Sequence, residues 1–160
     1  SINLVEAQLE RQNGSFAVTF GNHRLAVDEQ AARNRTKLGD FAGREVILGI
    51  RPEDFEDASL ESDTPPDRRL KVTSELTEPL GAEVLVHFST GATRIVSSAA
   101  AADAGEDAEV SLVDDEDEGP SDRLVARVSP KSRISEGNEV ELAVDTSRLY
   151  FFDPETREAI

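Results

Sequence analysis

Two histidines and one run of carboxylates are the side chains of this chain that could do chemistry. His23 and His87 each fall in a segment expected to be a strand, and neither has a nucleophile beside it. A histidine on a strand is more often a half-buried structural residue than a general base. The sequence motifs of phosphate-binding loops, nucleophile elbows and zinc proteases are missing. We therefore assign no catalytic residue.

The acidic run at 114–119 suggests a calcium loop at first sight. Carboxylates at its first, third and fifth positions precede Gly119, as in an EF-hand. The closing bidentate carboxylate of such a loop would fall at Val125, and no helices are expected on either side. We expect weak, nonspecific cation binding there and no tuned metal site.

Composition and charge limit what the chain can be. Its 160 residues suffice for one domain or two small ones, and 38% hydrophobic with 5% aromatic residues favours a modest β-rich module. The formal net charge of −16 repels phosphate backbones, which argues against a nucleic-acid partner. Without cysteine the chain has no disulfide and no thiolate metal site.

Location follows from what the sequence lacks. It has no apolar run long enough to span a membrane and no signal-peptide pattern, so we expect a soluble, cytosolic chain. It begins with Ser1 and contains no methionine. We expect a domain excised from a longer protein.

Strands and tight turns are predicted for the start of the chain. Period-two alternation predicts strands at 3–9, 16–20 and 24–27, and the turn dipeptides Asn13-Gly14 and Gly21-Asn22 separate them. The expected result is a meander of three strands.

A short helix and an abrupt strand end follow the meander. Asp28 suits the N-cap of a helix at 29–38, and Gly39 suits a left-handed stop. The apolar run at 45–50 predicts a buried strand. Pairing should stop there, because Pro52 has no amide hydrogen and keeps the preceding residue extended.

The rest of the chain is divided by an acidic, proline-containing stretch. Residues 56–67 are expected to be a linker between a first half, 1–55, and a second half, 68–160. Strands of the second half are predicted at 69–78, 82–89, 93–96, 123–128, 139–145 and 149–152.

Between two of these strands lies a segment of different character. Residues 97–122 contain ten acidic residues and no Lys or Arg. Such a segment buries too little apolar surface to offset its ordering entropy, and its charges repel one another. We expect a disordered acidic insertion.

The ordered segments resemble a known family. The motifs that carry the resemblance occur in the family's order and are Ser1-Ile2-Asn3-Leu4, Leu48-Gly49-Ile50-Arg51-Pro52-Glu53, Glu78-Pro79-Leu80-Gly81-Ala82-Glu83, Leu124-Val125-Ala126-Arg127-Val128 and Leu149-Tyr150-Phe151-Phe152-Asp153. They look like the C-terminal regulatory region of ATP-binding subunits of carbohydrate ABC importers, the maltose/trehalose/glycerol-phosphate class. The resemblance covers nearly the whole chain except the acidic segment.

This resemblance implies a mainly β fold, an OB-like β-barrel (transport-associated OB, TOBE) module with one short helix. It also implies a non-catalytic regulatory and dimerisation domain, with ATP and Mg bound in a preceding nucleotide-binding domain. The implied partners are that domain, a second ATPase subunit, the transporter's membrane subunits and a regulatory protein. The implied location is the inner face of the cell membrane.

Five residues within the family motifs are candidates for an interface or regulatory role: Arg51, Glu53, Glu78, Leu80 and Gly81. The alternative is structural: Gly49 and Gly81 would serve backbone geometry, and Arg51 and Glu53 would form a local ion pair.

Two other functions stay open at this stage. Related transport-associated modules bind oxyanions such as molybdate, although the acidic composition disfavours an anion site. A nucleic-acid-binding OB fold is a third possibility, and the sequence lacks the stacking aromatics and basic groove that it would need.

Overall fold

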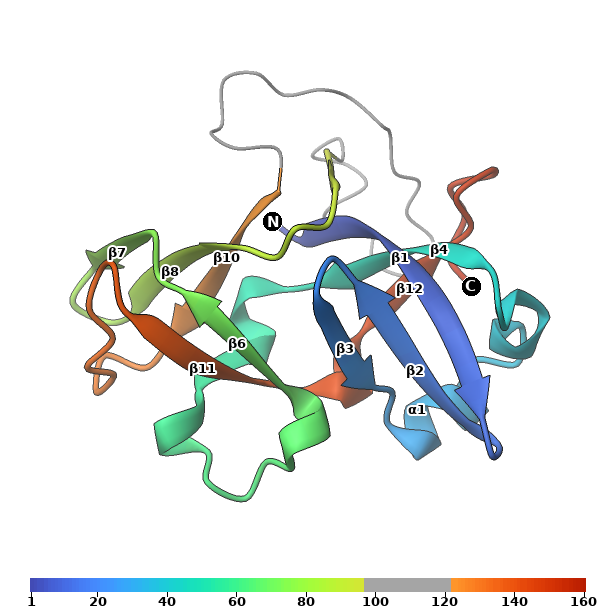
Figure 1. The fold of residues 1–160 in the computed structure, drawn as a ribbon, viewed down its shortest axis with the longest axis horizontal. Coiled ribbons are helices and arrows are strands. Elements are labelled where there is room, and N and C mark those ends of the chain that lie inside the picture. The colour runs from blue at the N-terminus through green and yellow to red at the C-terminus, as the bar shows by residue number, and fades with distance from the viewer. Residues whose placement is uncertain (97–121) are drawn as a thin grey trace.

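The computed structural model describes residues 1–96 and 122–160 and is mainly β (Figure 1). Its strands are β1 (Asn3–Gln12), β2 (Ser15–Phe20), β3 (His23–Ala26), β4 (Glu45–Ile50), β5 (Phe55–Asp57), β6 (Arg69–Thr73), β7 (Leu76–Pro79), β8 (Val84–Ser89), β9 (Arg94–Ile95), β10 (Arg123–Val128), β11 (Glu139–Val144) and β12 (Tyr150–Phe152). Its helical elements are α1 (Glu29–Asn34) and the 3-10 turns η1 (Leu38–Phe41), η2 (Pro52–Asp54), η3 (Ala58–Leu60), η4 (Pro66–Arg68) and η6 (Thr146–Arg148).

Strand β1 organises the largest sheet. The strand order is β12-β4-β1-β2-β3, and β9 pairs with β1 beside this path. One edge of β1 pairs with β4, whereas the other pairs with β9 at Leu4 and Val5 and with β2 from Gln8 onward. The meander of β1, β2 and β3 that alternation predicts is therefore confirmed.

Two three-stranded sheets complete the fold, in the orders β5-β11-β6 and β10-β8-β7. Figure 1 shows them on the left, with the β1–β2 hairpin and α1 on the right. A single buried apolar cluster takes side chains from all three sheets, among them Leu9, Leu48, Leu142 and Phe88. The sheets therefore enclose a shared core.

The predicted helix is shorter in the structure. Asp28 is the N-cap, as predicted, because its side chain accepts a hydrogen bond from the Ala31 amide at 3.1 Å. The helix ends at Asn34, however, and Gly39 lies within η1. Arg35 ends the helix because its guanidinium donates to the carbonyls of Leu149 and Ile160, both at 2.9 Å.

Two other expectations differ in detail. The strand predicted at 69–78 is two strands, because the chain turns at Ser74, whose amide donates to the Asn138 carbonyl at 3.0 Å. The segment expected to be a linker begins in β5, which pairs with β11, and Asp57 and Ala58 within it are buried. Those residues are ordered because they close a sheet whose other strands lie in the second half.

The strand that ends at the Arg-Pro step is confirmed. β4 stops at Ile50, and Pro52 opens η2. The acidic insertion expected at 97–122 lies, apart from Asp122, outside the described residues. In the described part of the chain, no helix has the length and apolar character needed to cross a membrane.

Candidate interaction site

The sheet β10-β8-β7 has one face in the core and one face on the surface. Val84, Val86 and Phe88 of β8 are buried, whereas the alternating Leu85 and His87 are partly exposed. Because cross-strand partners share a face, His87 lies between Leu76 of β7 and Val125 of β10. The residues of this surface, called the outer face below, are Leu76, Glu78, Leu85, His87, Val125 and Arg127, together with Leu80 in the turn that follows β7.

The outer face exposes large apolar side chains. Among the described residues, the exposed large hydrophobic side chains are Leu60, Leu76 and Leu80, with 42%, 37% and 55% of their surface accessible. Two of the three are on β7 or at its end, and the partly exposed Leu85 and Val125 continue the apolar surface across β8 and β10. A sheet face with such side chains is typical of a protein contact site.

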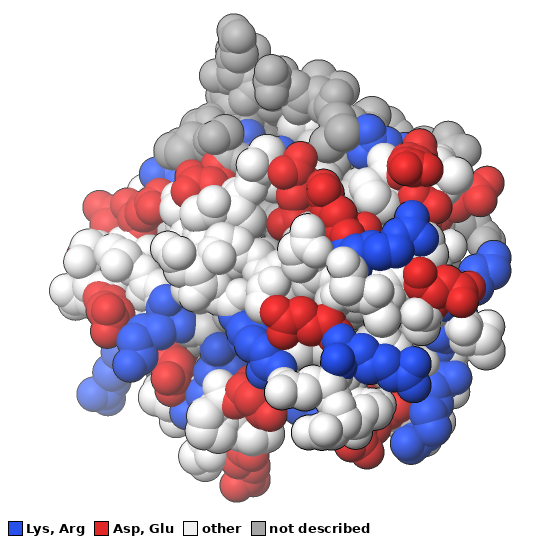
Figure 2. Space-filling model, turned by 45° about the vertical axis from the view of Figure 1, so that its right-hand side comes forward, with Lys and Arg blue, Asp and Glu red and all other residues white. Residues whose placement is uncertain are grey.

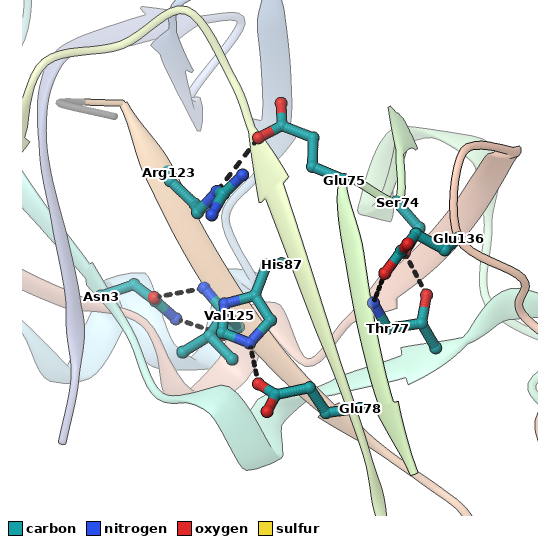
Figure 3. Close-up of polar contacts among 9 residues, drawn as sticks. All are labelled: Asn3, Ser74, Glu75, Thr77, Glu78, His87, Arg123, Val125 and Glu136. Atoms are coloured by element: carbon teal, nitrogen blue, oxygen red, sulfur yellow. Dashed lines mark hydrogen bonds and ion pairs between the residues drawn. The ribbon is translucent and has the colours of Figure 1, made fainter. Parts of the chain in front are cut away.

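Ion pairs lie within and beside this apolar surface, and Figure 3 shows two of them, His87–Glu78 and Arg123–Glu75. His87 Nε2 lies 2.6 Å from Glu78 Oε1, which joins β7 to β8 near the middle of the face. Arg123 of β10 pairs with Glu75 at 3.1 Å, and Arg127 pairs with Glu83. Partly exposed pairs of this kind contribute little to the stability of the fold. Their main effect is to fix where positive and negative charges lie on the face.

Side chains close both edges of this sheet. On the β7 edge, the Thr77 amide donates to Glu136 Oε1 at 3.1 Å, and Pro79 has no amide hydrogen. On the β10 edge, Asn3 accepts from the Val125 amide at 2.9 Å and donates to the Val125 carbonyl at 2.8 Å (Figure 3). These contacts occupy outward backbone groups on both edges, which makes the addition of a strand less favourable than contact with the face.

The turn from β7 to β8 presents Leu80 to solvent. The Leu80 amide donates to the Glu83 carbonyl at 2.8 Å, which closes the turn. Gly81 has φ +85°, a left-handed conformation that favours glycine, and open space surrounds the position of its missing Cβ. The backbone conformation of the turn therefore accounts for a glycine at position 81. It does not account for an exposed leucine at position 80.

The other predicted site residues lie elsewhere. Arg51 and Glu53 are at the end of β4 and in η2, and Glu53 is exposed. Within the described residues the Arg51 guanidinium contacts Tyr150, with Nε 3.4 Å from the hydroxyl and the group 5.2 Å from the ring centroid. The nearby Glu53 charge also acts on this guanidinium and helps to raise its pKa, so a local Arg51–Glu53 pairing stays a prediction beside the Tyr150 contact.

Gly49 fits its structural explanation. A Cβ there would come within 2.9 Å of Ile2 Cδ1 and 3.1 Å of Tyr150 Cβ. The position therefore needs glycine so that β12 and the side chains beside it can approach β4 closely.

The histidines and carboxylates do not form a chemical centre in the part of the chain that the structure describes. His23 is half-buried beside Phe20, and burial lowers its pKa from the usual 6.5. No group of three or more potential metal ligands occurs among residues 1–96 and 122–160. The acidic run at 114–119 lies outside those residues.

The sequence motifs pointed to part of the outer face only. Glu78 and Leu80 were candidates, whereas Leu76, Leu85 and Val125 were not. Alternation along the sequence places Leu85 and His87 on the face opposite Val84, Val86 and Phe88, as the structure has them, but it does not mark them as interface residues. Glu136 carries no comparable signal, because its role depends on a turn that packs beside β7.

Comparison with known proteins identifies related sequences for this chain. Residues 1–55 match the MalK OB fold domain family. The chain is 30% identical over 144 residues to the trehalose/maltose import ATP-binding protein MalK of Thermococcus litoralis, covering 89% of this chain and 31% of that protein. The chain carries the OB domain of sugar-importer ATP-binding subunits.

Further relatives of this OB domain agree. The sulfoquinovosyl glycerol transport ATP-binding protein SmoE of Agrobacterium fabrum is 33% identical over 157 residues, covering 92% of this chain and 34% of that protein. An uncharacterised ABC transporter ATP-binding protein, YurJ of Bacillus subtilis, is 27% identical and covers 99% of this chain and 35% of that protein. The OB domain thus spans about a third of the length of these relatives.

A solved structure supports the fold. The cytoplasmic molybdate-binding protein ModG, with molybdate bound, has a TM-score of 0.54 and 13% identity, covering 95% of this chain and 96% of that one. The predicted mainly β, OB-like module is confirmed.

Proposed function

We propose that this chain is the non-catalytic regulatory and dimerisation domain of the ATPase subunit of a carbohydrate ABC importer. ATP and Mg would bind in a nucleotide-binding domain outside the 160 residues described by the sequence. The partners we propose are that domain, a second copy of the subunit, the membrane subunits and a regulatory protein. The complete subunit would lie at the cytoplasmic face of the membrane.

The observation that carries this proposal is the outer face. It combines exposed Leu76 and Leu80 with paired charges, and the edges on either side of it are closed. Exposed apolar side chains mixed with paired charges are compatible with a protein interface. The site residues Glu78, Leu80 and Gly81 lie on this face or in the turn beside it, whereas Arg51 and Glu53 would form a second contact.

Mechanistically, contact between two copies keeps the attached ATPase domains at high effective concentration while they open and close. A regulator that binds across such a pair better in one state than in the other shifts the equilibrium toward that state. Neither step needs a catalytic group in this domain.

Sedimentation equilibrium of the 160-residue chain tests the contact. We expect Leu80→Asp to raise the dimer dissociation constant by about tenfold or more, because a buried leucine contributes roughly 1.5–3 kcal/mol and a charge cannot replace it. Leu60→Asp is the control, since Leu60 is also an exposed leucine but lies in η3. Equal dimerisation of both variants would rule out the outer face as the contact.

A transport assay on the complete subunit tests the regulatory part. Glu78→Lys reverses the charge beside His87 without touching the core. We expect basal uptake to be retained and the response to the inhibiting effector to be reduced. A normal effector response in this variant would argue against regulation through this face.

A further inference from the structure

One part of this acidic chain is positively charged. Residues 11–44 hold six Lys or Arg against three Asp or Glu, whereas the remainder holds 11 against 30. This part comprises the end of β1, the β2–β3 hairpin, α1 and η1, at the right of Figure 1. Figure 2 turns that side forward and shows Lys and Arg side chains gathered on its lower part, between scattered carboxylates.

A pocket opens within this positive region. It has a volume of about 480 Å³ and lies between the β1–β2 hairpin and α1. Its charged residues are Arg11, Arg33, Arg35 and Glu29, so arginines outnumber the carboxylate. Asn13, Ser15 and Thr36 add amide and hydroxyl groups. The volume is within the range of small-molecule sites.

The arginines are held in different ways. The Arg35 guanidinium is fixed by the Leu149 and Ile160 carbonyls and supplies a positioned positive charge. Arg11 stacks on Phe16, with its guanidinium 5.1 Å from the ring centroid. Arg33 donates to the side chain of Gln30 at 2.9 Å. Stacking and fixed hydrogen bonds lower the entropy cost of bringing several guanidinium groups to one ligand.

We propose that this pocket binds a small phosphorylated metabolite through its phosphate group. Guanidinium groups bind tetrahedral oxyanions with paired, charge-assisted hydrogen bonds. The chain as a whole is strongly acidic, whereas this pocket has three arginines and one carboxylate, so the local charge there favours an anion. The site is distinct from the outer face and goes beyond the proposed function.

Isothermal titration calorimetry of the chain at fixed ionic strength tests the site, with glucose 6-phosphate as the probe. We expect saturable binding, weakened about tenfold in Arg11→Gln and in Arg33→Gln, because each substitution removes charge-assisted hydrogen bonds to the phosphate group. Inorganic phosphate should compete with the probe, and glucose should give no signal.

Arg24→Gln is the matched control. Arg24 is exposed on β3 and pairs with Glu10 at 3.3 Å. Its substitution removes the same charge at a position outside the pocket. Binding in this variant should stay within about twofold of the unmodified chain, since a single screened surface charge has a small effect. The site is refuted if the probe does not bind, if all three variants lose affinity equally, or if inorganic phosphate fails to compete.

Discussion

Tyr150 and Asp54 show how single side chains determine what the end of β4 can do. The Tyr150 hydroxyl and ring both hold Arg51, and their hydrogen bond raises the pKa of the guanidinium above its usual value. Arg51 therefore stays charged and positioned on the surface. A partner that contacts it meets a preorganised cation, which lowers the entropy cost of binding.

Asp54 is the buried carboxyl of η2. Its Oδ1 lies 3.3 Å from Arg148 Nε, and Oδ2 has no hydrogen-bond partner in the structure. Burial raises its pKa above the usual 3.8. The folded state then binds a proton more tightly than the unfolded chain, so the free energy of unfolding falls as the pH rises through the range between these two pKa values.

We expect Asp54→Asn to remove this pH dependence and to raise the thermal midpoint at pH 7, because an amide can still accept from Arg148 without a buried charge. Thermal melts from pH 3 to pH 8 measure the effect. The exposed Glu139→Gln is the control. A wild-type pH slope that persists in Asp54→Asn would assign it to another group.

At the scale of elements, Asn3 joins the largest sheet to the sheet of the outer face. Its side chain donates to the Ile50 carbonyl at 3.0 Å and makes two further hydrogen bonds to Val125, 122 positions away. The start of β1, the end of β4 and the middle of β10 are thereby held by one amide. This amide also sets where the outer face lies relative to Arg51.

We expect Asn3→Ala to lower the free energy of unfolding by about 3 kcal/mol, because it leaves buried backbone groups of Ile50 and Val125 without a partner. Urea denaturation measures the change. Gln8→Ala, at an exposed position of the same strand, should stay within about 0.5 kcal/mol of the unmodified chain. An equal free energy of unfolding for the two variants would mean that the Asn3 side chain does not stabilise the contact between the two sheets.

Local sequence patterns predicted the positions of most strands. They did not predict contacts between residues that lie far apart in the sequence. Alternation located nearly every strand, and the faces of β8 followed from Val84, Val86 and Phe88. The helix was overestimated because Arg35 is held by the carbonyls of Leu149 and Ile160, a contact that no local pattern encodes. Asn3 and Glu136 likewise act on strands far away along the chain.

Charge governs behaviour at the scale of the whole molecule. With a net charge of −16, repulsion between carboxylates opposes the compact state. The segment 11–44, which has a positive balance, lies apart from the outer face in Figure 1. Dissolved salt shortens the range of this repulsion, to about 3 Å at 1 M from about 10 Å at 0.1 M.

We expect the thermal midpoint of the chain to rise with NaCl concentration, by several degrees between about 0.05 M and 1 M, because screening relieves the repulsion. KCl should act equally if screening is the cause. Differential scanning calorimetry measures both series. A flat or falling midpoint would show that carboxylate repulsion is not what limits stability.

The pairing of β12 with β4 has a consequence for how the protein is made. Phe151 faces Leu48 across this pair, so the last strand of the chain completes a sheet begun by the first. A ribosome releases β4 long before it releases β12. The edge of β4 must therefore stay open during synthesis, and an open strand edge favours wrong pairing with neighbouring chains. Safe folding of this domain depends on the arrival of its final strand.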